Sequence, residues 1–126
     1  MKLRPPSLLA EAILWFGVLG APLTWAGMHV VGVGVGTAAC GPFGETHSVD
    51  PNVWGLAMTI AGGIVAVVAL TAAIVMWVAT RTDDSAPPLG RMHLLATIGL
   101  VLGVLFIFLI LMAGLGATVT PECVQS

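Results

Sequence analysis

Three long stretches without Asp, Glu, Lys or Arg restrict what this chain can fold into. They cover residues 12–44, 53–80 and 92–121. Each is longer than the roughly 20 residues with which a helix crosses about 30 Å of hydrocarbon. Because lipid offers no hydrogen-bond partners, the backbone of such a stretch has to be helical. The sequence therefore predicts an all-α membrane protein with three transmembrane helices, over about 8–35, 53–80 and 92–116, as a single unit covering 1–126.

Composition supports lipid as the solvent around most of the chain. Charged residues make up 8% of the sequence and hydrophobic residues 58%, whereas an ordinary soluble domain carries about 25% charge. So few charges cannot cover a water-exposed surface. The net charge of -2 and the absence of a basic patch in the sequence also exclude nucleic acid as a partner.

The positions of the basic residues predict the orientation. Lys2 and Arg4 precede the first span, and Arg81 and Arg91 flank the connection between the second and third spans. The other connection and the C-terminal tail contain no Lys or Arg, so the positive-inside rule places the N-terminus inside and the C-terminus outside. The first span imitates a signal peptide, but Glu11 interrupts its apolar part, and we expect it to be retained uncleaved.

Small residues recur at helical spacing in each predicted span. Helices in lipid associate through close van der Waals packing, which small residues allow. We expect these small faces to hold the three helices together, with a partner protein as the other possible contact. The predicted packing residues are Gly17, Gly20, Thr24, Gly27, Gly62, Ala66, Ala69, Ala73, Gly99 and Gly103.

Two further features of the first span affect its helix. Pro22 lies in the middle of the span and predicts a kink. Glycine occupies every second position of the segment Val31–Gly36, and its low helix propensity predicts fraying there, with the helix ending at about Val35. The segment contains a Gly-x-Gly-x-Gly pattern, but a dinucleotide site needs a strand before it and a helix after it, which excludes that interpretation.

The two cysteines, Cys40 and Cys123, follow the first and third predicted spans, so both are expected on the outer side. That compartment permits disulfides, and we expect a structural disulfide between them. The alternative is a copper-related site, because thiols and imidazoles suit Cu(I) and His29 and His47 are expected on the same side. The sequence contains no metal-like spacing such as Cys-x-x-Cys in support of it.

Glu11 and His29 are the possible polar sites of the first span. A carboxylate near a span is a functional candidate by default, yet Glu11 lies about one turn into the predicted helix, where it can reach the interface or an arginine. His29 and His93 are separated by roughly 25 Å of helix rise, so they cannot ligate one haem between them. We expect His29 to be a hydrogen-bonded packing residue and His93 an interfacial residue.

The sequence contains no catalytic motif, whether a Ser-His-Asp arrangement, His-Glu-x-x-His or a phosphate-binding loop. We therefore expect a protein that is not an enzyme, with no catalytic residues, no cofactor and no metal site. A transporter would need polar lining within its spans, and the spans offer little beyond a few hydroxyls, those of Thr24, Thr59, Thr71 and Thr97.

Two parts of the sequence resemble small, poorly characterised multi-span membrane proteins of actinobacteria and other bacteria. They are Trp15–Ala26 followed by His29 and Cys40, and Gly90-Arg91 together with the terminal Pro121–Ser126. Members of this group are often encoded beside the subunits of haem–copper cytochrome c oxidases. The resemblance implies an accessory role in an oxidase or its assembly, in the bacterial inner membrane, with larger respiratory subunits and lipid as partners.

Together these inferences predict a non-catalytic accessory subunit of a respiratory membrane complex of the cytochrome oxidase type. Two alternatives stay open. One is an oxidase assembly or copper-delivery factor that uses the outward-facing thiols, and the other is a small self-associating transporter, for which a homo-oligomer is expected.

Overall fold

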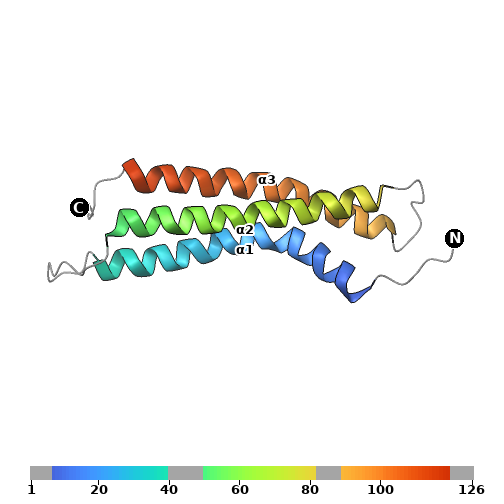
Figure 1. Ribbon diagram of the computed structural model, residues 1–126, viewed down its shortest axis with the longest axis horizontal. Helices are drawn as coiled ribbons and strands as arrows, with labels where there is room; N and C mark the ends of the chain where they lie inside the picture. The colour runs from blue at the N-terminus through green and yellow to red at the C-terminus, as the bar shows by residue number, and fades with distance from the viewer. Residues whose placement is uncertain (1–6, 40–49, 82–88, 120–126) are drawn as a thin grey trace.

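The computed structural model describes residues 7–39, 50–81 and 89–119, which contain three helices and no strand. The helices are α1 (Leu8–Ala39), α2 (Pro51–Ala79) and α3 (Leu89–Val119). They run up, down and up beside one another, and each contacts both of the others (Figure 1). We call the end where α1 stops and α2 starts the Asp50 end, and the end where α2 stops and α3 starts the Arg81 end.

Local hydrogen bonds explain where the helices begin and end. Asp50 has extended backbone angles, and its carboxylate accepts from the backbone N–H of Asn52 at 2.9 Å, which caps the start of α2. The hydroxyl oxygen of Ser7 accepts from the N–H of Ala10 at 3.2 Å and does the same for α1. At the end of α2, the Thr80 hydroxyl donates to the carbonyl of Met76 at 2.7 Å.

The helix α1 continues four residues past the end at Val35 that the sequence predicted, through the alternating valines and glycines to Ala39. The expectation of fraying there was therefore wrong. Backbone groups in an apolar environment lose more by leaving the helix than glycine loses by entering it, since glycine costs only about 1 kcal/mol relative to alanine. The Thr37 hydroxyl also donates to the carbonyl of Gly34 at 3.0 Å within this last stretch.

The first half of α1 diverges from the line of its second half (Figure 1). We attribute this bend to Pro22, which lies inside α1, because proline cannot donate to the carbonyl four residues earlier and its ring pushes that turn open. The hydroxyl of Thr24 donates to the carbonyl of Gly20 at 2.7 Å beside the bend. This bond goes to Gly20 and not to Val18, the carbonyl to which the residue at position 22 would otherwise donate.

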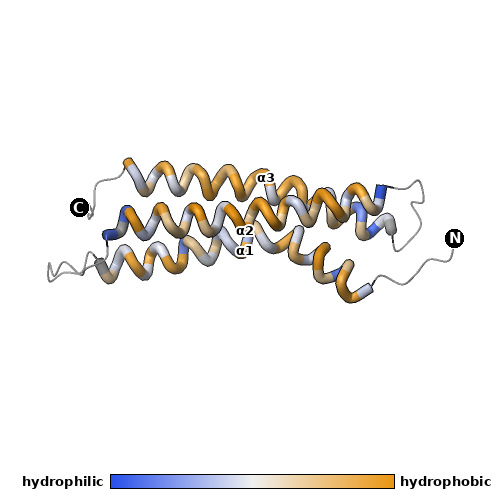
Figure 2. The backbone as a smooth tube through the Cα atoms, viewed as in Figure 1, coloured by the Kyte–Doolittle hydropathy of each residue, from blue (hydrophilic) through white to orange (hydrophobic). Residues whose placement is uncertain are grey.

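The core of the bundle is thin and made mostly of small side chains. One buried cluster toward the Arg81 end contains Leu14, Met76 and Ala96, and a second contains Ala21, Ala66 and Ile110. In each helix only 22% of the most apolar 18-residue window is buried inside the bundle. Large apolar side chains are exposed along all three helices, and most of the residues along the helices are hydrophobic, shown in orange in Figure 2.

All three helices are long and apolar enough to cross a membrane. The candidate spans are Leu8–Ala38, Asn52–Ala79 and Gly90–Val119, with mean hydropathies of 1.5, 2.4 and 3.0. Since a span needs about 20 residues, each exceeds the requirement. The all-helical fold predicted from the sequence is confirmed, and the structure indicates a multi-pass membrane protein.

Candidate functional site

Glycines bring the three helices into backbone contact in the middle of the bundle. A Cβ atom on Gly17 would lie 2.9 Å from the backbone nitrogen of Ala73, and one on Gly99 would lie 3.1 Å from the carbonyl oxygen of Gly17. At Gly20, an added Cβ would lie 2.7 Å from the Cβ of Ala69. A side chain at Gly17 or Gly20 would force a neighbouring helix to shift, and one at Gly99 would be tightly packed, so the small residues let α1, α2 and α3 approach closely there.

The other small residues singled out in the sequence divide into two groups. Most lie in the interface: Ala66, Ala69 and Ala73 are buried, Gly62 faces Met28 and Thr24, and Gly103 faces Leu70. Gly27 is different, because it is exposed and no atom lies within 4 Å of where its Cβ would be. Gly27 therefore takes no part in the packing of the three helices, and its inclusion among the packing residues needs correction.

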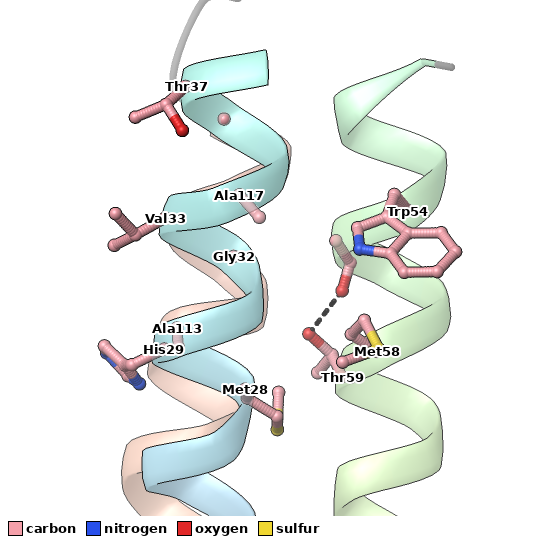
Figure 3. A pocket seen from close by; sticks show the side chains of 12 residues that line it. Met28, His29, Gly32, Val33, Thr37, Trp54, Met58, Thr59, Ala113 and Ala117 are labelled. Carbon is pink, nitrogen blue, oxygen red and sulfur yellow. Dashed lines mark hydrogen bonds between the residues drawn. The ribbon is translucent and has the colours of Figure 1, made fainter. Parts of the chain in front are cut away.

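Toward the Asp50 end the helices line an open lateral pocket of about 380 Å³ (Figure 3). Its wall on α1 consists of Met28, His29, Gly32, Val33, Gly36 and Thr37. On α2 it consists of Trp54, Gly55, Met58 and Thr59, and α3 contributes Ala113 and Ala117 at the back. The sequence analysis did not predict this pocket. The alternating glycines of Val31–Gly36, interpreted there as a cause of fraying, include two residues of its wall, Gly32 and Gly36.

His29 stands in the wall of this pocket with one nitrogen bound. Its Nδ1 lies 3.0 Å from the carbonyl oxygen of Trp25. A carbonyl only accepts, so Nδ1 carries the hydrogen, and Nε2 of the neutral ring is an acceptor. The imidazole also packs on the Trp25 ring, with 4.2 Å between centroids, and Trp25 contacts Phe106 of α3 edge-on at 5.5 Å. These contacts hold the His29 ring against Trp25 of its own helix, and the His29 side chain itself is exposed.

The remaining polar groups of the pocket lie on α1 and α2. The hydroxyl of Thr59 donates to the carbonyl of Gly55 at 2.8 Å, drawn as a dashed line in Figure 3, and the hydroxyl of Thr37 donates to Gly34. Both hydroxyl hydrogens are thus used within their own helices. The indole nitrogen of Trp54 is on the side of its ring that faces the pocket (Figure 3), and an indole N–H can only donate.

A second polar cluster joins α2 to α3 at the Arg81 end. The Thr80 hydroxyl lies 3.1 Å from Nδ1 of His93, and the His93 ring stacks on Trp77 with 5.8 Å between centroids. The guanidinium of Arg81 lies 4.8 Å from the centroid of the same Trp77 ring, in a cation–π contact. The sequence analysis expected His93 at the membrane–water interface. It did not predict the hydrogen bond between His93 and Thr80, which lies thirteen positions earlier.

Of the other polar positions singled out in the sequence, the structure describes only Glu11. Glu11 is exposed in the first turn of α1, and its described contact is the backbone bond to Ser7 at 3.1 Å. Cys40 and Cys123 lie outside the described residues, as does His47. Within residues 7–39, 50–81 and 89–119, His, Cys, Asp and Glu form no group of three that could hold a metal ion.

The geometry of the described residues defines a class of protein: a bundle of three helices, each long and apolar enough to cross a membrane, with a lateral pocket lined by all three. Comparison with known proteins adds no relative, since no family model, curated protein or solved structure matches the chain.

Proposed function

We propose that this chain is a non-catalytic accessory subunit that packs against larger integral membrane subunits, in a respiratory complex of the cytochrome oxidase type in the bacterial inner membrane. The observation that carries the subunit role is the thin core. With 22% of each apolar window buried, most of the surface of every helix is available to lipid or to another protein. The respiratory and oxidase part rests on the sequence resemblance described above.

The most suitable contact surface is on α3. One stripe of it carries large apolar side chains that are exposed, Leu105, Phe108, Met112 and Leu115, each between 44% and 58% exposed. Aromatic residues and methionine are enriched in the core of protein interfaces, and large side chains on one helix can fit between the small residues of another. We call Leu105, Phe108, Met112 and Leu115 the α3 face.

Native purification tests the proposal. An affinity tag on this chain, mild detergent extraction from its own membranes and mass spectrometry of the eluate should recover larger integral membrane proteins in fixed proportion. If no integral membrane partner is recovered, the accessory-subunit proposal is wrong. If the recovered partner is not an oxidase, the respiratory part fails and the subunit role stands.

A matched pair of variants locates the contact. Replacing Phe108 and Met112 by alanine removes bulk from the α3 face and should reduce the recovered partner several-fold. Replacing Ile64 and Val68, which are exposed at the same spacing on α2, should leave recovery unchanged. Unchanged recovery with the α3 pair and a loss with the α2 pair would move the contact to α2.

A further inference from the structure

We propose that the Arg81 end binds the phosphate group of an anionic phospholipid, with the Arg81 guanidinium, held over the Trp77 ring, as the specific donor and Arg91 as a second positive charge. This inference concerns a lipid and does not depend on the accessory-subunit role. Four features of this end carry it: the fixed Trp77 ring, the free donors of Arg81, the balance of charge and the apolar surface beside Arg81.

A chain of contacts between α2 and α3 fixes the Trp77 ring. The Thr80 hydroxyl donates to the carbonyl of Met76 at 2.7 Å, so its oxygen accepts from Nδ1 of His93 at 3.1 Å. The His93 ring held in this way stacks on Trp77, with 27° between the ring planes. Trp77 also packs against the buried cluster at the same end. The indole is therefore a ring of set orientation at the end of α2.

Arg81 is restrained by this ring and keeps its hydrogen-bond donors free. Its Cζ lies 4.8 Å from the centroid of Trp77, and this cation–π contact needs no oxygen acceptor. Among the described residues the Arg81 side chain forms no hydrogen bond or ion pair. Guanidinium N–H groups match two oxygens of a phosphate in a bidentate pair. A side chain that is already restrained loses less conformational entropy when it forms such a pair.

The described charges at this end favour an anion. They are Arg81, Arg91 and Glu11, since the other described carboxylate caps α2 at the opposite end. Arg91 is exposed in the first turn of α3, which contains no acidic residue, so the positive end of the helix dipole adds to its charge. Asp83 and Asp84 lie outside the described residues, and neutralisation of the arginines by these two is the alternative that the experiment below distinguishes.

The position of Arg81 makes a phospholipid the source of the phosphate. Both arginines lie within two residues of the ends of candidate spans, at Ala79 and Gly90, which is where headgroups meet the helices of a membrane protein. Val78 and Ile74, three and seven positions before Arg81, lie on the same side of α2. They are 58% and 43% exposed. An acyl chain can therefore lie along α2 while its phosphate reaches Arg81.

Native mass spectrometry of the purified full chain measures the lipid that it retains. The chain is kept in detergent micelles with equal amounts of phosphatidylglycerol and phosphatidylcholine of the same acyl chains. We expect one phosphatidylglycerol per chain, preferred at least about fivefold, because about 1 kcal/mol per arginine near an anionic headgroup corresponds to that ratio. Equal retention of the two lipids would overturn the proposal and indicate that Asp83 and Asp84 neutralise the arginines.

A water-soluble headgroup tests whether the ligand has to be a lipid. Glycerol 3-phosphate carries the phosphate without acyl chains, so an excess of it should leave the bound phosphatidylglycerol in place. Displacement of the lipid by glycerol 3-phosphate would show an anion site that needs no acyl chain, and would overturn the assignment to a phospholipid.

Two variants that keep the charge test the role of Arg81. Lysine cannot form the planar bidentate pair with phosphate, so Arg81→Lys should lower the preference for phosphatidylglycerol several-fold. Arg91→Lys is the matched control, because no ring contact is described for Arg91, and it should retain the preference. Equal effects of the two substitutions, or no effect of either, would reduce the site to diffuse positive charge and overturn the proposal.

Trp77→Leu removes the ring and leaves every charge in place. It should lower the preference for phosphatidylglycerol as much as Arg81→Lys does, whereas Trp54→Leu, at the opposite end of α2, should not change it. An unchanged preference in Trp77→Leu would show that the ring does not position Arg81, against the proposal. If Trp77→Leu does not fold, the lysine pair still decides, since Arg81 and Arg91 are both exposed.

Discussion

The hydroxyl oxygen of Thr80 lies 3.1 Å from Nδ1 of His93 and joins the end of α2 to the start of α3. Thr80 is only 6% exposed, and its hydroxyl hydrogen is directed to the carbonyl of Met76 at 2.7 Å. A hydroxyl has a single hydrogen, so the threonine oxygen accepts and the histidine Nδ1–H donates. The bond therefore fixes which His93 nitrogen carries the hydrogen.

Thr80→Val keeps the shape of the side chain and removes this bond. Hydrogen bonds between membrane helices contribute about 0.6 kcal/mol on average and up to about 1.7 kcal/mol, and we expect a loss in the upper part of this range because Thr80 is buried. Unfolding of the purified protein in mixed micelles measures it. Thr71→Val is the control, since the Thr71 hydroxyl is exposed and bonds only to Val67 of its own helix. Equal losses in the two variants would contradict the inter-helix role.

Gly17→Ala should destabilise the bundle by about 1–3 kcal/mol, the usual cost of overpacking. The added Cβ would lie 2.9 Å from the backbone nitrogen of Ala73, and backbone cannot yield as the tip of a side chain can. The same substitution at Gly27 meets open space and should be neutral or stabilising by about 0.5–1 kcal/mol through helix propensity. The same unfolding measurement compares them, and a stable Gly17→Ala variant would contradict the close approach of α1 to α2.

Asp50→Ala should lower stability by about 0.5–2 kcal/mol, because it removes the carboxylate that caps α2 through the N–H of Asn52. Asp50→Asn keeps an acceptor oxygen at the same position and should retain most of the stability. Unfolding curves and amide hydrogen exchange in the first turn of α2 provide the measurement. Faster exchange in both variants alike would indicate that charge and not the cap geometry stabilises this end.

The disulfide between Cys40 and Cys123 remains a prediction from the sequence. The ends of α1 and α3, from which the two cysteines follow, lie at the same end of the bundle (Figure 1). We expect no reaction with a thiol reagent before reduction, two labels per chain after it, and an intact mass lower by two hydrogen atoms. Labelling without reduction would remove the disulfide and favour the assembly-factor or copper-delivery alternative.

Some of the interior could be read from residue spacing and some could not. Gly17, Gly20 and Gly27 look equivalent in the sequence, yet the first two meet a neighbouring helix and Gly27 meets none. Gly114, which faces Thr59, was not singled out. The difference arises because the rotation of each helix about its axis, and the bend of α1, decide which side of a helix is inside, and neither is encoded in spacing along one helix.

The candidate site shows the same division. His29 was recognised as a polar residue of the first span, and its Trp25 bond links two residues one helical turn apart. The pocket was not recognised, because its wall combines glycines of α1 with Trp54 and Met58 of α2 and with alanines of α3. Which residues of α1 border the pocket depends on the joint arrangement of the three helices.

The amino-acid sequence by itself determined that this chain is helical and suited to a lipid environment. Its uncharged stretches are long enough to cross a membrane, and in lipid a helix is the structure in which such a stretch satisfies its own backbone hydrogen bonds. The tertiary structure alone decided where helices touch and where they leave a pocket. Contacts such as Thr80 to His93 and Gly17 to Ala73 depend on the simultaneous packing of all three helices, which fixes their rotation, register and bend together.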